Sequence, residues 1–481
     1  MLSSLFMPSA APSAAEASVA GSPAEPLLPP PVKLSTPEAY LHLFKANLGP
    51  GILALPFAFA YATNAAALPT TAAVILQGTY GILLQVLIEK KIRPDHSDLN
   101  TTLHTHEFAQ TAFGKPGRIA ASVSVALLQL GICAVYIGLV AENMQTFTSL
   151  SRLVCVLIAY LPCALLTLLP NLNSISPLSI FGNVVMLAAI MSTFVVSIIV
   201  LAGNDSNSVS SIVSLGQDDV HAASKASSCI LHITKGSFAS VVACLTQAFY
   251  AFEGIAVVLP ICSQLSERAE REYPRTVFIA VGIVGVAFLV LGGISSAAFP
   301  LVDKANILIY LQNMYTTNSL VGRLFLALNI SLTASCIATF PLQFTPVAHV
   351  FSDVCTLPVS PRLVHLFAVS ACALFVACVP GLDLLIQFVG ALTNTTIAAL
   401  PCAVHARLLL TSEKVGPSQP VINVSPGGPH VSDAIFPRQS LWRAILLIID
   451  FGIIAFCLTV GLVGVIQTIL SAASTSCKNT V

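Results

Sequence analysis

The sequence predicts an all-α membrane protein with eleven transmembrane helices, of which the first and the sixth are interrupted. The first observation is composition: 56% of the 481 residues are hydrophobic and only 9% are charged, whereas a soluble domain has about 25% charged residues. The second is that apolar segments long enough to span a bilayer, about 20 residues as a helix, recur along the chain. The third is that two of these segments contain glycine and proline at inner positions, where a simple anchor would lose backbone hydrogen bonds.

The chain divides into five predicted parts. Residues 1–36 are rich in Ala, Ser and Pro, which predicts a disordered N-terminal tail. Residues 37–406 form a ten-helix membrane core, 407–440 a cytoplasmic loop, 441–470 the eleventh helix and 471–481 a C-terminal tail. The predicted spans are 40–60, 67–88, 119–142, 152–170, 176–202, 237–262, 276–299, 321–347, 363–380, 383–406 and 441–470.

The first predicted helix is interrupted at Asn47–Pro56, which reads NLGPGILALP. Unwound backbone is tolerated in a membrane where it lines a polar cavity, as in many secondary transporters. Residues Ala251–Pro260, AFEGIAVVLP, again place a glycine before an apolar run that ends in Leu-Pro. Two interrupted segments in corresponding halves of a chain indicate a transporter binding site. A kinked but inert helix is the alternative interpretation of the first break.

Basic residues predict the orientation, because positive charges favour cytoplasmic loops. With a cytoplasmic N-terminus, fourteen Lys and Arg lie on the cytoplasmic side and six on the other. Eleven spans then place the C-terminus on the extracytoplasmic side. The sequon at Asn204 falls in an extracytoplasmic loop and is a candidate glycosylation site. The sequence leaves open whether the membrane is the plasma membrane or that of a vacuole or lysosome.

Five long motifs carry a resemblance to a known family. They are HLFKANLGPGILALPFAFA from His42, LLQLGICAVYIGLVAEN from Leu127, CLTQAFYAFEGIAVVLP from Cys244, TASCIATFPLQFTPVAHVF from Thr333 and VPGLDLLIQFVGALTNTTIAALP from Val379. With them the chain resembles the amino acid/auxin permease family of the APC superfamily, and within it the proton-coupled and vacuolar amino-acid transporters. The resemblance implies the LeuT-like fold, in which helices 1 to 5 and 6 to 10 form an inverted repeat and the eleventh is peripheral. It also implies that the substrate lies between the unwound centres of helices 1 and 6.

Residues at the two breaks are the predicted substrate ligands. Helix N-termini and free N–H groups suit the substrate carboxylate, while unwound carbonyls and helix C-termini suit a cation. The predicted carboxylate ligands are Gly49, Gly51 and Ile52, and the predicted ammonium ligands are the carbonyls of Phe252, Glu253 and Gly254.

Three further residues around the breaks have open roles or depart from the family. Asn47 either contacts the substrate or pins the unwound backbone. Tyr136 either lines the cavity or is a core or interfacial ring. Where the family commonly has Thr or a small residue, this chain has Pro50, which lacks an N–H group.

Ionisable residues inside the membrane are candidates for ion coupling, because a charge at the bilayer centre costs about 2.5 to 3.5 kcal/mol on insertion scales. Glu253, at the helix-6 break, is the strongest proton-coupling candidate, and a permanently paired structural carboxylate is its alternative. His42 is the second, because histidine titrates near neutral pH. The alternative coupling ion is sodium, with hydroxyl ligands from Thr333 and Ser335. Asp450, in the eleventh helix, is interpreted as a packing or assembly contact.

The predicted function is alternating-access transport of small neutral amino acids, coupled to protons. The alternatives are a sodium-coupled symporter and an amino-acid sensor (transceptor) that uses the same pocket. The sequence contains no grouping of nucleophile, base and metal, so an enzyme is not predicted. It contains 21 basic and 21 acidic residues, so no basic field predicts nucleic-acid binding. No metal site or cofactor is predicted, and the predicted partners are the substrate, the coupling ion and the lipid bilayer.

Overall fold

The protein is helical throughout the part of the chain that its computed structural model describes. That part comprises residues 34–92, 105–148, 150–168, 176–202, 235–252, 258–262, 264–315, 319–354, 360–394, 398–412 and 440–478. The helices are α1 (Thr36–Asn47), the 3₁₀ helix η1 (Pro50–Ala54), α2 (Leu55–Ala62), α3 (Asn64–Ile92), α4 (Thr105–Phe147), α5 (Arg152–Thr167), α6 (Ser176–Ala202), α8 (Phe238–Ala251), α9 (Val258–Cys262), α10 (Glu267–Ala298), α11 (Ile307–Met314), α12 (Leu320–Val354), α13 (Pro361–Cys378), α14 (Leu382–Thr393), α15 (Leu400–Ser412) and α17 (Ser440–Lys478).

Several of these helices are long and apolar enough to cross a membrane. Six meet the length of a full span: Asn64–Glu89, Thr105–Phe147, Val184–Ala202, Glu267–Ala298, Leu320–Ala348 and Leu441–Ala473. Shorter apolar helices accompany them: Pro50–Ala62, Arg152–Thr167, Phe238–Ala251, Arg362–Cys378, Leu382–Thr393 and Leu400–Thr411. Apolar side chains on these helices are both buried in the core and exposed on the outer surface, as expected where the surrounding solvent is lipid.

The described part of the chain begins at Leu34, which pairs with the segment before α10. The Leu34 N–H donates to the Gln264 carbonyl (2.8 Å), and the Ser266 N–H donates to the Leu34 carbonyl (2.9 Å). Ser35 then begins α1 by donating its N–H (2.7 Å) and its hydroxyl (2.8 Å) to the Glu38 carboxylate. These two hydrogen bonds, the backbone one first, lower the pKa of Glu38. Residues 1–33 of the predicted tail lie outside the described residues.

Two predicted helix boundaries differ from the structure near the C-terminus. The tenth helix, predicted over 383–406, corresponds to two elements: α14, which ends at Thr393, and α15, which begins at Leu400. The residues that flank the undescribed 395–397, Asn394 and Ala398, are π-helical. Wider turns of this kind are frequent at functional sites. The eleventh helix, expected over 441–470, extends to Lys478 in α17.

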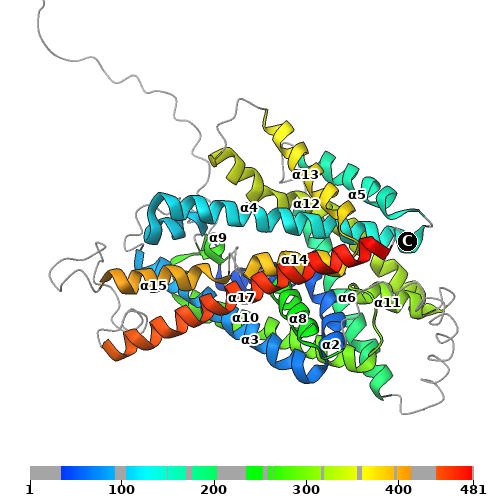
Figure 1. Ribbon diagram of the computed structural model, residues 1–481, viewed down its shortest axis with the longest axis horizontal. Helices are drawn as coiled ribbons and strands as arrows, with labels where there is room; N and C mark the ends of the chain where they lie inside the picture. Colours follow the sequence, from blue (N-terminus) through cyan, green and yellow to red (C-terminus); the bar gives the residue numbers. More distant parts are fainter. Residues whose placement is uncertain are drawn as a thin grey trace, which may run out of the picture. The chain divides into compact units, whose positions relative to one another are not determined.

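The helices pack so that segments far apart in sequence lie together at the first break. In Figure 1, α8 lies beside α2, and both pack closely in the structure, while η1 also contacts α8. The long α17 runs along α14 and α15 and also packs on α8. One continuous core of buried side chains joins helix 1 with α4, α8, α10, α12 and α14. The break in helix 1 thus lies inside the core.

Thr63, between α2 and α3, has a backbone conformation (φ 64°, ψ 146°) that side chains rarely adopt. Strain of this kind costs about 1–3 kcal/mol. The Thr63 side chain is exposed, so little packing is lost on its removal. We expect Thr63→Gly to stabilise the purified protein by about 1 kcal/mol after the entropy cost of glycine, seen as a higher Tm. Thr63→Ala keeps the strain and serves as the control; an equal gain from both substitutions would contradict this account.

Candidate functional site

Helix 1 changes conformation within the predicted break. The first segment, α1, ends at Asn47, and Gly49 is extended (φ −83°, ψ 178°). The 3₁₀ segment then starts at Pro50, where the missing N–H costs nothing because the first donors of a helix have no internal partner. The Ile52 N–H donates to the Gly49 carbonyl (3.3 Å). This N–H, predicted to bind a carboxylate, is therefore already used inside the turn.

Helix 6 also stops at this place. Its first half, α8, ends at Ala251, and α9 starts at Val258, with residues 253–257 outside the described part. Gly51 makes the close contact between the two helices: a Cβ there would lie 2.8 Å from the Ala251 Cα and 3.0 Å from the Tyr250 ring. The side of Gly51 on which a Cβ would lie is thus closed by α8, and this glycine has a packing reason for its small size.

Gly49 and Asn47 have the opposite surroundings. A Cβ built at Gly49 meets no atom within 4 Å. The Asn47 side chain is 1% exposed, and its Nδ2 donates to the Leu43 carbonyl (2.8 Å). Its Oδ1 is buried without a hydrogen-bond partner among the described residues. Asn47 therefore pins the end of α1 with its nitrogen and leaves a buried acceptor, a group that is costly to bury unpaired.

The helix ends give the break a dipolar character. Both α1 and α8 terminate there with their C-terminal carbonyls, whereas η1 and α2 begin there. Helix C-termini carry partial negative charge and N-termini partial positive charge. The arrangement suits a ligand with an ammonium and a carboxylate close together.

Gln247, on α8 one turn before the break, was not singled out from the sequence. It is 1% exposed, and neither its Oε1 nor its Nε2 has a partner among the described residues. The available signal was a lone amide in an apolar helix, four residues before Ala251.

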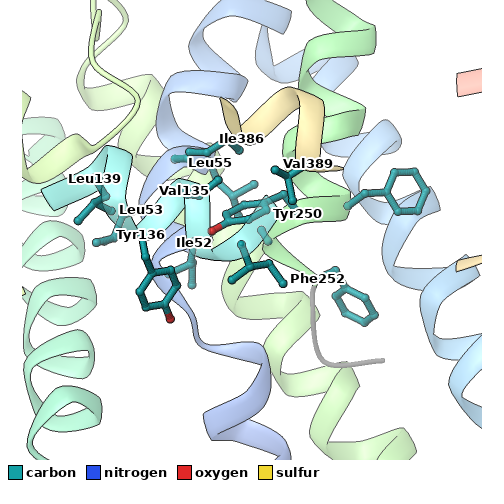
Figure 2. Close-up of a cluster of buried hydrophobic side chains, with 14 of the residues drawn as sticks. Ile52, Leu53, Leu55, Val135, Tyr136, Leu139, Tyr250, Phe252, Ile386 and Val389 are labelled. Atoms are coloured by element: carbon teal, nitrogen blue, oxygen red, sulfur yellow. The ribbon is translucent and has the colours of Figure 1, made fainter. Parts of the chain in front are cut away.

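Figure 2 shows side chains of helix 1, α4, α8 and α14 gathered around the break. Tyr250 lies at the centre of this view, near Val389 of α14 and Leu55 of α2. Its ring contacts the position of Gly51 and is 2% exposed. Tyr250, like Gln247, belongs to the site but was not predicted.

The other predicted residues of the site are distributed over several helices. Tyr136 is 6% exposed, lies in the same cluster (Figure 2), and accepts a hydrogen bond from Gln343 Nε2 (3.3 Å). The Phe252 ring packs edge-on against Phe288 of α10, with centroids 6.3 Å apart. His42 is on the exposed side of α1. Of these three, Tyr136 and Phe252 have side chains in the cluster of Figure 2.

Thr333, a predicted sodium ligand, belongs to a buried hydrogen-bond network. Its hydroxyl donates to the Asn329 carbonyl (2.8 Å) and accepts from Asn143 Nδ2 (2.9 Å). Asn306 Nδ2 donates to Asn143 Oδ1 (3.3 Å) and to Asn329 Oδ1 (3.4 Å), and Asn329 Nδ2 donates to Gln312 Oε1 (2.7 Å). The network joins α4, α11 and α12, so one acceptor site of Thr333 is already occupied.

Ser335, the other predicted sodium ligand, is buried and lies against Gly182 of α6. Glu253, Gly254 and Asn204, all predicted from the sequence, lie outside the described residues. In the described part of the chain, no three His, Cys, Asp or Glu residues are grouped so as to hold a metal ion.

A helical membrane bundle in which helix ends meet at a buried, partly unsatisfied polar site is typical of membrane transporters. Solved structures share the fold. The chain is similar to MhsT in complex with L-phenylalanine (12% identity, TM-score 0.55, covering 91% of this chain and 99% of that one). It is also similar to the inward-facing conformation of Mhp1 (13% identity, TM-score 0.52, covering 93% of this chain and 92% of that one). At these identities the similarity shows the fold alone, which is LeuT-like.

The chain belongs to the family described as transmembrane amino acid transporter protein, which matches residues 32–419. It is 25% identical over 334 residues to amino acid transporter AVT3A of Arabidopsis thaliana, covering 68% of this chain and 70% of that protein. It is 25% identical over 337 residues to vacuolar amino acid transporter 3 of Saccharomyces cerevisiae, covering 67% of this chain and 42% of that longer protein. The protein is therefore a multi-pass amino acid transmembrane transporter and not an enzyme.

Proposed function

We propose that the protein moves small neutral amino acids by alternating access and that protons drive this transport. The observation that carries the proposal is the break in helix 1, where a Cβ at Gly49 would meet open space and the buried Oδ1 of Asn47, two residues earlier, has no hydrogen-bond partner among the described residues. In this proposal the chain has eleven spans with the 5+5 inverted repeat, and the second break contributes Glu253 and Gly254.

The proposed substrate has a small, uncharged side chain. Its ammonium binds Asn47 Oδ1 and the helix C-termini of α1 and α8, and its carboxylate binds near Gly49 and the start of η1. The described side chains nearest the break, such as Ile52, Tyr250 and Gln247, are apolar or uncharged. No charge among them would compensate a charged substrate side chain, which favours neutral amino acids.

Protons are favoured over sodium as the coupling ion. Sodium needs several oxygen ligands, and the Thr333 hydroxyl already donates to Asn329 and accepts from Asn143. Glu253, at the second break, is the proposed proton acceptor, since a carboxylate inside the membrane exchanges a proton as its hydration changes.

The proposed location is a vacuolar or lysosomal membrane with a cytoplasmic N-terminus. Two relatives named as vacuolar amino acid transporters, from Saccharomyces cerevisiae and Schizosaccharomyces pombe, support the compartment. The excess of Lys and Arg in the loops predicted as cytoplasmic supports the orientation.

Uptake into proteoliposomes tests the proposal. A gradient of two pH units supplies about 2.7 kcal/mol per proton, which accumulates a substrate about 100-fold at one proton each. We expect this accumulation for radiolabelled alanine, glycine or proline in the wild type. We expect Glu253→Gln to abolish it while gradient-free exchange of the same amino acid continues.

Glu267→Gln is the matched control, because this carboxylate is exposed at the start of α10. It should accumulate substrate as the wild type does. Uptake driven only by a sodium gradient would refute proton coupling and return attention to Thr333 and Ser335. Folded protein that exchanges no amino acid under any gradient would refute transport of this substrate class.

A further inference from the structure

A second buried polar group is formed by side chains of α3, α15 and α17. His405 Nδ1 of α15 and Asp450 Oδ2 of α17 are 2.7 Å apart, and both side chains are 0% exposed. The Tyr80 hydroxyl of α3 donates to Asp450 Oδ1 (2.9 Å). Both oxygens of one intramembrane carboxylate therefore have partners, each from a different helix.

The surroundings of this group are apolar. A buried cluster beside it consists of Leu84, Ile88, Phe108, Leu259, Cys402 and Val404, with Tyr80 and Ile453 packed against it. Among the described residues, the thiol of Cys402 on α15 interacts electrostatically with Asp450 and Tyr80, and the thiol of Cys457 on α17 interacts with Cys402.

The packed elements also carry ionisable groups. Glu89 of α3, next to Ile88 of the cluster, is buried and accepts a hydrogen bond from Cys262 Sγ of α9 (3.6 Å). Helix α4 contributes Phe108, which follows His106 and Glu107 in sequence, and α9 contributes Leu259. Arg443, two turns before Asp450, donates to the Leu409 carbonyl of α15 (2.6 Å).

Stability alone does not explain such a pair. The desolvation cost of burying two charges can exceed the energy gained from their attraction. Well-packed apolar residues often stabilise a protein interior as well as such a pair, or better. Ionisable residues inside membranes instead mark ion and proton pathways by default. His405 and Asp450 lie 45 residues apart in sequence, and each comes from a helix that is otherwise largely apolar.

The group lies close to a change of helix type. Helix α15 begins at Leu400, shortly after Asn394 and Ala398, which are π-helical and flank the undescribed 395–397. On the other side of that change, Asn394 Nδ2 donates to the Cys457 carbonyl of α17 (2.9 Å). Thus α17 holds helix 10 on both sides, once by a neutral hydrogen bond and once by a titratable pair. Leu259 of α9, the far half of broken helix 6, packs in the same cluster.

We propose that His405 and Asp450 form a second proton-binding site of the transport cycle, which holds α15 against α17 when a proton is bound. In the protonated form, an imidazolium faces a carboxylate and the pair is neutral overall. Release of the imidazolium proton to water leaves a neutral imidazole, a carboxylate and one net negative charge in an apolar cluster. Because that charge is costly to bury, the deprotonated form favours entry of water and separation of the two helices. Tyr80 is a positioning residue that donates to the carboxylate in both forms.

This inference rests on the proposed proton-coupled transport, and its test distinguishes failure of the second proton site from failure of proton coupling itself. Purified full-length variants His405→Gln and Asp450→Asn are reconstituted, and proton entry is followed with a pH-sensitive dye beside amino-acid uptake between about pH 5 and 8. We expect both variants to exchange substrate without a gradient but to carry fewer protons per amino acid, with a flattened pH profile. The control, His365→Gln, removes a half-buried histidine of α13 that contacts the Thr167 carbonyl (3.4 Å), and it should match the wild type.

Each outcome bears on a stated idea. A wild-type proton ratio and pH profile in His405→Gln would overturn the second site and leave coupling at Glu253 standing. A wild type that moves amino acid without protons would overturn the coupling proposal, and this inference with it. Where His405→Gln and Asp450→Asn fail to fold, Tyr80→Phe decides: it keeps the ring and removes one donor, so the midpoint of the uptake pH profile should shift, and an unchanged midpoint overturns the proposal.

Discussion

Gly390→Ala is expected to abolish transport and to lower the stability of the protein by about 1–3 kcal/mol or more. Gly390 lies on α14 where this helix crosses α8, and a Cβ there would overlap the Thr246 carbonyl oxygen. It would also lie 3.2 Å from the Tyr250 Cβ. The overlapping atom belongs to the backbone, so no rotamer change relieves the clash. The two helices must move apart, and α8 carries Tyr250 and Gln247 of the site.

Thermal unfolding of the purified protein and gradient-free substrate exchange measure this effect. Gly282→Ala is the matched control, because a Cβ at this position in α10 meets no atom within 4 Å. Alanine is favoured over glycine within helices by about 1 kcal/mol, so the control should have an unchanged or slightly higher Tm. Wild-type Tm and exchange in Gly390→Ala would show that α8 and α14 are not packed as described.

Substitutions at the two glycines of the break are expected to have different effects. Gly51→Ala places a Cβ 2.8 Å from the Ala251 Cα, so it should push η1 away from α8, lower the Tm and abolish exchange. Gly49→Ala should fold with a wild-type Tm, because nothing lies within 4 Å of its Cβ. It should nevertheless weaken substrate binding and raise the KM, since the methyl group occupies the space proposed for the ligand.

The comparison of Tm with KM separates packing from binding. Both quantities are measured on both variants. We expect the loss of exchange in Gly51→Ala to come with a lower Tm, and the weaker substrate binding of Gly49→Ala to come with a wild-type Tm. A Gly49→Ala protein with the wild-type KM would remove this glycine from the proposed site. A Gly51→Ala protein with wild-type Tm and exchange would contradict the close contact between the two broken helices.

The sequence by itself determined that the chain is a helical membrane protein and where helix 1 breaks. Both follow from local chemistry: about 20 apolar residues satisfy a bilayer as a helix, and Pro50 and Pro56 cannot donate the hydrogen bonds of a continuous one. The class of protein followed from the same motifs. The change of helix type in helix 10 was missed, because its segment contains Asn394 and two threonines but no proline or glycine at the interruption.

Only the tertiary structure decided what each residue at the breaks faces. Gly49 and Gly51 look equivalent in sequence. A Cβ at Gly49 would meet open space, whereas a Cβ at Gly51 would meet α8. The direction of a Cβ matters only once a neighbouring helix is placed. Asp450 was interpreted as a packing contact, and its contact is with His405 and Tyr80, the latter 370 residues away. Periodicity cannot orient helices that are apolar all round, so pairings such as these depend on helix packing, which local sequence does not encode.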